Sequence, residues 1–310
     1  MAGAQERVLK RRVKSIQSTK KTTKAMELIA ASRIVKAQQR IYAARPYIDA
    51  IDSIARDLSP LVPSANQIND TARPALFIVG ADRGLCGAYN SNVLKAAEKI
   101  LSLPEYNETK PLVVLVGKKI QARFRYEQTR FDEAHVGFTD APSFENARQV
   151  SKTFLSLIVE NEISLAKVVS TRFLSLASQK VEVRNLFPVE VSDEPPSAES
   201  ADFELEPSAE QIWQSLLPQW IEAKLFLALL EASASEHAAR QRAMKAATDN
   251  AEELIKNLRR VMNRARQDSI TSEIMDIVGG AEALRSSSNQ GGISTIRPED
   301  AGFASTREAR

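Results

Sequence analysis

The chain has 310 residues, of which 43% are hydrophobic and 26% are charged, and its net charge is +3. This balance is typical of a folded globular protein and excludes a chain that is disordered throughout. Its 11 Gly are about half of the usual share, which favours helix over a many-turned β architecture. A single cysteine, Cys86, excludes a disulfide within the chain, and two His with one Cys provide no ligand set for structural zinc.

The sequence contains no candidate membrane span, because no apolar run approaches 18 residues. The first residues, MAGAQERVLKRRV, lack the apolar core of a signal peptide. We therefore expect a bacterial or similar unprocessed cytoplasmic product.

Residues 1–58 are predicted to form an N-terminal helix. Residues 4–58 contain no Gly and a single Pro, Pro46, which is expected to kink or break the helix because proline lacks an N–H. Lys20 stands where the apolar pattern would place a hydrophobic residue. The pattern itself advances in alternating steps of four and three residues, which is a heptad seam, through Ala30, Ile34, Ala37, Ile41, Ala44, Ile48, Ile51, Ala55 and Leu58.

The middle of the chain is predicted to hold a linker, residues 59–72, and a small, mainly parallel α/β domain, residues 73–191. Short apolar runs there alternate with helical stretches, which is the order of a parallel sheet with crossover helices. The last two runs, within 166–191, are expected to form a hairpin at the sheet edge. Residues 192–207 are acidic and Pro-rich and are predicted to be a mobile loop.

Residues 208–285 are predicted to form a C-terminal helix, with a break allowed at Pro218, and residues 286–310 a disordered tail. Each terminal seam alone is too narrow to be stable in water, so the two ends are expected to pair as an antiparallel coiled coil. A five-residue step from Ala265 to Ile270 is expected to move the C-terminal seam to another face. The first part of that seam is Ala247, Ala251, Leu254, Leu258, Val261 and Ala265, and the second is Ile270, Ile274, Ile277, Ala281 and Leu284.

The segment GADRGLCGAYN (80–90) follows an apolar run and opens a helix, where a phosphate-binding loop would sit. It lacks the glycine spacing of either common nucleotide loop, so we favour a tight turn over a dinucleotide enzyme. Gly84 and Gly87 would provide backbone room, and Arg83 and Cys86 would stabilise the turn. No catalytic residue, cofactor site or metal site is predicted.

The N-terminal helix is strongly basic, with twelve Lys and Arg between residues 6 and 45 against two acids, Glu6 and Glu27. Eight acids and no base lie between residues 190 and 210. A basic helix of this kind can bind nucleic acid, bind an acidic protein, or simply be a solvated face. Composition alone leaves these three alternatives open.

Four collinear segments resemble the gamma subunit of F-type ATP synthases, and the resemblance extends over residues 2–285. The fourth carries the family's signature, with Thr271, Glu273 and Asp276 followed by Gly280. The segments are TKAMELIAASR (23–33), DRGLCGAYN (82–90), EHAARQRAMKAATDNAEELI (236–255) and NRARQDSITSEIMDIVGGAEAL (263–284).

The resemblance implies the central rotary shaft of a proton-translocating ATP synthase. The coiled coil would enter the hexamer of alpha and beta subunits, and the α/β domain would sit below with the epsilon subunit and the membrane c-ring. The chain would be a non-catalytic, cofactor-free peripheral subunit at the cytoplasmic face of a bacterial plasma membrane, with no nucleic-acid partner. The paired cysteines of the plastid version are absent, so no thiol control is expected.

The resemblance also implies site residues. Met26 corresponds to the position where shaft and beta loop meet, although packing in the seam explains it equally well. The tail 286–310 extends past the usual family end and is hypothesised to modulate rotation. The expected contacts are Lys20, Lys21 and Lys24 with acidic loops of beta, Arg266 and Gln267 with a catch loop, and Thr271, Glu273 and Asp276 with the hexamer.

Overall fold

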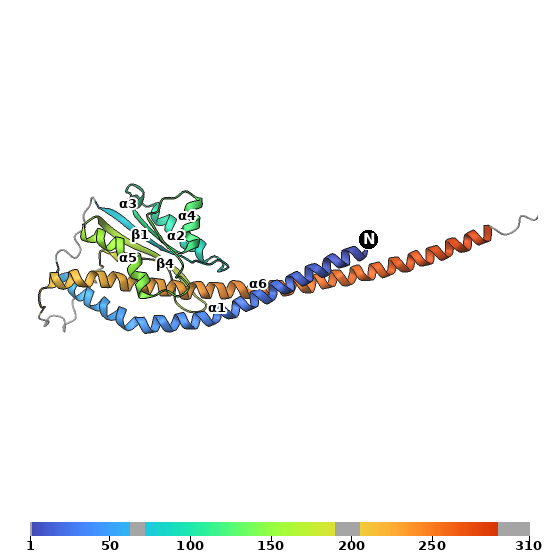
Figure 1. The fold of residues 1–310 in the computed structure, drawn as a ribbon, viewed down its shortest axis with the longest axis horizontal. Helices are drawn as coiled ribbons and strands as arrows, with labels where there is room; N and C mark the ends of the chain where they lie inside the picture. The colour runs from blue at the N-terminus through green and yellow to red at the C-terminus, as the bar shows by residue number, and fades with distance from the viewer. Residues whose placement is uncertain (1, 63–71, 190–204, 291–310) are drawn as a thin grey trace, which may run out of the picture. The chain divides into compact units, whose positions relative to one another are not determined.

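The computed structural model describes residues 2–62, 72–189 and 205–290. These form two compact units: residues 19–250, with their gaps, and a second unit that combines residues 2–18 with residues 251–290. Both terminal helices pass through both units. In chain order (Figure 1), the elements are α1 (Ala2–Leu58), η1 (Ser59–Leu61), β1 (Arg73–Val79), α2 (Tyr89–Leu101), α3 (Pro104–Asn107), β2 (Leu112–Val116), α4 (Lys118–Tyr126), β3 (Glu133–His135), α5 (Phe144–Val159), β4 (Ile163–Phe173), β5 (Gln179–Phe187) and α6 (Ala209–Gln290).

One five-stranded sheet forms the centre of the larger unit, in the order β3-β2-β1-β4-β5. The first four strands are parallel, and β5 pairs antiparallel with β4 at the edge. The predicted parallel sheet and edge hairpin are thus confirmed. Strand β3 was not predicted, because its three residues, Glu133, Ala134 and His135, carry no apolar run that would reveal it.

Helices cover both faces of this sheet (Figure 1). On one face, α2, α3 and α4 pack against the even-numbered residues of β1, such as Leu76 and Ile78. On the other face, α5 and parts of α1 and α6 pack against Phe77 and its neighbours. The rings of Phe77 and Phe154 meet edge to face at 5.2 Å, which ties α5 to the centre of the sheet.

Within the larger unit, α1 and α6 pair as an antiparallel coiled coil. Thr23 meets Thr248, whereas Asp52, much further along α1, meets Trp220, earlier on α6. The fold class predicted from the sequence, paired terminal helices around an inserted α/β domain, is therefore confirmed. All the predicted seam residues of α1 are buried except Ala44, which is half-buried: Ala30, Ile34, Ala37, Ile41, Ile48, Ile51, Ala55 and Leu58.

The breaks expected at the two prolines do not occur. Helix α1 runs through Pro46 and α6 runs through Pro218. Pro46 is exposed, as is Tyr42 four residues earlier, so water can reach the backbone carbonyl that the missing N–H leaves free. Helix α6 begins after Ser208, whose hydroxyl accepts a hydrogen bond from Gln211 N at 3.3 Å.

The predicted seam of α6 is wrong by one residue at several positions. Ile255 is 8% exposed whereas Leu254 is 52% exposed, and Thr248 is buried in place of Ala247. The sequence pattern assigned the seam position to Ala247 because only apolar residues were considered. A threonine can also occupy a seam when its hydroxyl is hydrogen-bonded, as that of Thr248 is. The seam positions observed on α6 are Met244, Thr248, Ala251, Ile255, Leu258, Met262, Ala265 and Ser269, all buried or half-buried, and Ala247 is half-buried beside Thr248.

Helix α6 ends at Gln290, five residues inside the range 286–310 assigned to a disordered tail. A helix continues there although the sequence is rich in Ser, which has only a modest cost in a helix interior. The rest of that tail, residues 291–310, lies outside the described residues. So do 63–71 of the expected linker and most of the expected acidic loop.

Candidate partner surfaces and the joint of the α/β domain

The predicted contact residues of α1 lie in the larger unit, on two turns of helix. Lys21 and Lys24 are exposed, whereas Lys20 and Met26 are half-buried. Lys24 Nζ lies 3.0 Å from Glu27 Oε1, an ion pair within the helix. These side chains form a basic helical face whose positive charge is partly balanced by its own chain.

The predicted contact residues of α6 lie in the second unit, and all five are exposed. Thr271 Oγ1 donates to Gln267 O at 3.0 Å, so this hydroxyl serves the helix itself. The structure therefore places the predicted site residues on two separate surfaces, one in each unit. The five residues are Arg266, Gln267, Thr271, Glu273 and Asp276.

The same stretch of α6 exposes a series of large apolar side chains. Ile277 is 71% exposed, and its neighbours along the helix are exposed as well. Contiguous apolar surface of this kind is typical of a protein–protein interface. The exposed residues are Ile270, Ile274, Met275, Ile277, Val278 and Leu284.

The turn 80–90 is held by the carboxylate of Asp82. Its Oδ2 accepts hydrogen bonds from Gly137 N at 2.8 Å and Thr139 N at 3.1 Å, and its Oδ1 accepts one from Lys118 N at 3.0 Å. Burial opposes ionisation of Asp82, but these backbone donors outweigh burial and lower its pKa. The sequence alone assigned no role to Asp82, because its partners lie 36 to 57 residues further along the chain, at the first residue of α4 and in the loop after β3.

Within this turn, Gly87 has φ +59°, in the left-handed region that favours glycine, and Leu85 has φ +62°. Gly84 has no such φ, and an added Cβ would lie 3.5 Å from Lys119 Cε, an ordinary contact. Gly84 is instead used for its carbonyl oxygen, which accepts from Arg240 at 3.4 Å.

Cys86 is buried inside the turn. Its Sγ accepts a hydrogen bond from Asn90 Nδ2 at 3.4 Å, and Arg83 O lies 3.8 Å from it. Burial, reinforced by the nearby charge of Glu236, raises the pKa of the thiol. A buried thiol with a raised pKa is a poor nucleophile and a structural group.

Arg83 belongs to a cluster of polar side chains where the α/β domain meets both long helices. The Oδ2 atom of Asp140 lies 2.7 Å from Arg33 Nη1 on α1 and 3.2 Å from Arg83 Nε in the turn. The backbone oxygen of Asp140 accepts from Ser233 Oγ at 3.0 Å and pairs with His237 Nε2 at 3.2 Å, both on α6. One loop residue thus contacts α1, α6 and the turn.

Arg240 and Glu236 complete this cluster on α6. Glu236 is 1% exposed and Arg240 is 7% exposed, and the two form an ion pair one helical turn apart. Burial raises the pKa of Glu236 to about 7, against the opposing charge of Arg240. Sequence reasoning assigned no role to these two residues, since only the fold reveals that their charges are buried.

Neither a metal-binding cluster nor a membrane-spanning helix is present among the described residues. No group of three or more His, Cys, Asp or Glu side chains among them is placed to hold a metal ion. No helix in the described parts combines the length and apolarity that crossing a bilayer requires.

Together, the paired terminal helices, the inserted α/β domain and the exposed helical surfaces define a class of protein: an antiparallel coiled-coil subunit with an α/β insertion. The chain matches the family model of ATP synthase (ATP-synt) over residues 5–284. It is 39% identical over 307 residues to the ATP synthase gamma chain of Saccharopolyspora erythraea, covering 93% of this chain and 100% of the relative. It is 44% identical over 300 residues to that of Renibacterium salmoninarum, covering 92% and 100%. The chain therefore belongs to the ATP synthase gamma chain family, as the sequence motifs indicated.

Solved structures share the fold. The Euglena gracilis mitochondrial ATP synthase, in a structure of OSCP, F1 and c-ring, contains a chain with a TM-score of 0.68 and 18% identity, covering 95% of this chain and 99% of that one. The central stalk and c-ring structure of the Tetrahymena thermophila mitochondrial enzyme contains another, with a TM-score of 0.56 and 20% identity, covering 73% and 99%.

Proposed function

We propose that this chain is the central rotary shaft of a proton-translocating ATP synthase, transmitting torque between the membrane c-ring and the catalytic alpha/beta hexamer. Membership of the gamma chain family over nearly the whole chain carries the proposal. The alternative of a nucleic-acid-binding coiled coil is not favoured, since full-length relatives are ATP synthase gamma chains.

The physical properties of the two long helices suit this role. A shaft has to resist twisting, and glycine loosens a helix by about 1 kcal/mol relative to alanine. Apart from Gly3, the glycines of α1 and α6 are Gly279 and Gly280, both near the end of α6. The buried seam between the helices supports both of them along the larger unit.

The exposed surfaces provide the proposed contacts. The basic face at Lys20, Lys21 and Lys24 would meet acidic loops of the beta subunits, with Met26 at its edge. Charge attraction acts over several ångströms and does not lock one orientation, which suits a rotating surface. The residues 266–276 of α6 and the apolar side chains beside them would contact the inside of the hexamer.

The remaining parts of the proposal concern chemistry and place. The chain itself would perform no chemical step, since catalytic groups would belong to the alpha and beta subunits. It would act as a peripheral subunit at the cytoplasmic face of a bacterial membrane, held there by the c-ring, with the epsilon subunit beside the α/β domain.

A complementation experiment tests this function. The chain is expressed with its own alpha and beta subunits in cells that lack a gamma subunit, and ATP-driven proton pumping is measured in membrane vesicles. We expect co-purification with alpha and beta at fixed stoichiometry and restored pumping. Salt-sensitive DNA binding without co-purification would instead support the nucleic-acid alternative.

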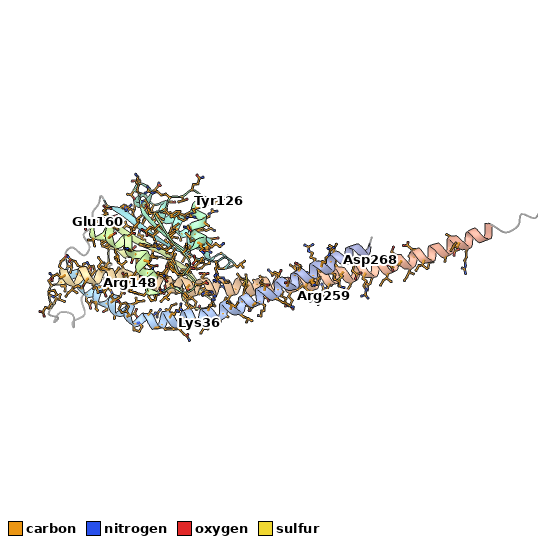
Figure 2. The ribbon with its side chains drawn as sticks, in the orientation of Figure 1. Lys36, Tyr126, Arg148, Glu160, Arg259 and Asp268 are labelled. Carbon is orange, nitrogen blue, oxygen red and sulfur yellow. The ribbon has the colours of Figure 1, made fainter. Side chains whose placement is uncertain are left out.

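The contact surface of α6 is tested in the same system with Arg266→Ala/Gln267→Ala. Arg259→Ala is the matched control, because Arg259 projects from the same helix (Figure 2) outside the proposed contact stretch. We expect the double variant to lower ATP hydrolysis about tenfold, the equivalent of losing one or two charge-assisted hydrogen bonds. Equal rates of ATP hydrolysis in the double variant and the control would show that Arg266 and Gln267 do not contribute to the interface.

The segment 286–310 is proposed to modulate rotation. Its deletion is expected to change the rates of ATP hydrolysis and proton-coupled synthesis. Unchanged rates for both would eliminate this role.

A further inference from the structure

Helix α6 contacts the α/β domain in two different ways. From Leu225 to Ala232, the contact is mainly apolar, with Ala228 and Leu229 packed into the core beneath the sheet. From Ser233 to Arg242, the contact is mainly polar, through hydroxyl, imidazole and guanidinium groups of α6. The polar stretch lies toward the end at which α6 continues as coiled coil.

The polar stretch fixes geometry that apolar packing does not. Apolar contact is non-directional and depends mainly on the area removed from water. Hydrogen bonds weaken steeply when their angle departs from linear. A rotation of α6 against the domain could therefore preserve much of the apolar contact while it broke the contacts of Asp140 and Arg240.

Arg240 has a specific partner for each part of its guanidinium. Nε and Nη2 both lie 3.4 Å from Gly84 O, and Nη2 also pairs with Glu236. Nη1 lies 3.2 Å from His237 Nδ1, while His237 Nε2 lies 3.2 Å from Asp140 O. This arrangement assigns His237 the neutral tautomer with its proton on Nε2, so that Nδ1 accepts and Nε2 donates.

The buried ion pair Glu236–Arg240 is not explained by stability. Desolvation of two charges offsets much of their attraction, and apolar side chains of similar volume often give equal or greater stability. A buried polar contact that is costly in free energy can instead fix one orientation among several. Here the fixed orientation is that of α6 against the turn 80–90.

We infer that Asp140, Glu236 and Arg240 act as positioning residues in a joint that holds the α/β domain at one angle to the coiled coil, so that the two turn as one body. The inference rests on the proposed shaft function. Torque that enters through the domain would leave it at this joint. Without the joint, part of the rotation would be absorbed as twist between domain and helices.

The test uses the assembled ATP synthase with Glu236→Leu/Arg240→Met, which replaces the ion pair with apolar groups of similar size. Two quantities are measured: the protons pumped per ATP hydrolysed, and the angular fluctuation of a bead fixed to the α/β domain while the hexamer is immobilised. We expect normal assembly, about threefold less pumping per ATP and wider fluctuation, an effect typical of mutations along a coupling network.

The matched control is Arg123→Met/Glu127→Leu, which removes an exposed ion pair of the same spacing at the C-terminal end of α4. Exposed pairs contribute little, so we expect both quantities to equal those of the unmodified complex. A double variant at 236 and 240 that assembles and matches this control in both quantities would overturn the inference.

A milder variant keeps the inference testable if the double variant does not assemble. Asp140→Asn preserves size and the backbone contacts with Ser233 and His237, but removes the charge shared by Arg33 and Arg83. We expect a wider angular fluctuation of the bead in this variant as well. An angular fluctuation equal to that of the unmodified complex would overturn the inference. Failure of the unmodified chain to restore pumping would refute the proposed function instead, which keeps the two failures distinct.

Discussion

A pair of buried threonine hydroxyls connects α1 and α6, and its removal gives a quantitative prediction. Thr23 Oγ1 and Thr248 Oγ1 lie 2.8 Å apart across the coiled coil. Each also lies near a carbonyl of its own helix, Lys20 O at 3.1 Å for Thr23 and Met244 O at 2.8 Å for Thr248. Either hydroxyl can therefore keep one hydrogen bond if the other is lost.

The expected free energies follow from this geometry. Thr23→Val or Thr248→Val removes the bond between the helices but leaves the remaining hydroxyl donating to its own helix. Each single variant should lower the free energy of unfolding by about 1 kcal/mol, the net value of one hydrogen bond. The hydroxyl-to-carbonyl bond that remains within one helix adds no net stability, because such back-bonding to a helix carbonyl is neutral or slightly destabilising. The double variant should therefore cost about the same 1 kcal/mol as either single variant, which gives a coupling energy of about 1 kcal/mol.

Urea unfolding of the full chain, followed by circular dichroism, measures the double-mutant cycle. Thr109→Val is the control, since its hydroxyl also donates to a carbonyl four residues earlier but is exposed on the surface. We expect that control to change the free energy of unfolding by less than about 0.5 kcal/mol. Additive effects of the two seam variants, with no coupling energy, would show that the hydroxyls do not support each other.

Three other predictions concern single sites. Burial raises the pKa of Glu236 from 4.5 to about 7, so between these pH values the folded chain holds a proton that the unfolded chain has released. The contribution of Glu236 to the free energy of unfolding should therefore fall by about 3 kcal/mol as pH rises through this range. Urea unfolding at several pH values should show that this fall is absent in Glu236→Gln. The same pH dependence in both proteins would contradict the raised pKa of Glu236. Gly117 has φ +103°, and an added Cβ would lie 2.8 Å from Gly80 C, whereas Gly137 has φ +98° with nothing within 4 Å. Gly117→Ala should thus cost about 2 kcal/mol more than Gly137→Ala by urea unfolding, and equal costs would argue against the clash. Cys86 is buried and is the one cysteine of the chain, so reductant should leave the rate of ATP hydrolysis by the complex unaltered. A rate that depends on reductant, in a complex whose other subunits lack cysteine, would contradict this prediction.

The seam of α1 could be predicted from the sequence because its burial follows directly from heptad spacing. Ile34 and Ile48 are both at most 2% exposed, as expected of apolar residues at those positions. The central strands could be predicted for a similar reason, because β1 and β2 are almost continuous apolar runs that are buried on both faces of the sheet.

The seam of α6 and the joint of the α/β domain could not be predicted, because both depend on polar residues that become buried. Thr248 is a seam residue only because Thr23 and Met244 O satisfy its hydroxyl. Glu236 and Arg240 resemble any exposed i, i+4 pair until the turn 80–90 covers them. Gly84, which accepts from Arg240, is 156 residues away in the chain, and no local pattern encodes that proximity.

Polar contacts also resolve an ambiguity that a heptad seam leaves open. Sliding α1 by seven residues against α6 would again place apolar side chains opposite one another, so hydrophobic spacing alone permits several registers. Between Thr23 and Asp52, α1 advances 29 residues, while α6 returns 28 residues from Thr248 to Trp220. The register of α1 against α6 therefore changes by only one residue between the Thr23–Thr248 contact and the Asp52–Trp220 contact.

At the second of these contacts, Asp52 accepts from Trp220 Nε1 at 2.9 Å and lies 2.6 Å from Lys224 Nζ. Burial opposes its ionisation, but hydrogen bonds from Lys224 and Trp220 prevail and lower its pKa. A seven-residue slip would separate Asp52 from both partners and Thr23 from Thr248, whereas the apolar seam would re-form. The apolar residues thus provide most of the attraction between the helices, and a few polar pairs select the single alignment in which a shaft can transmit a defined angle.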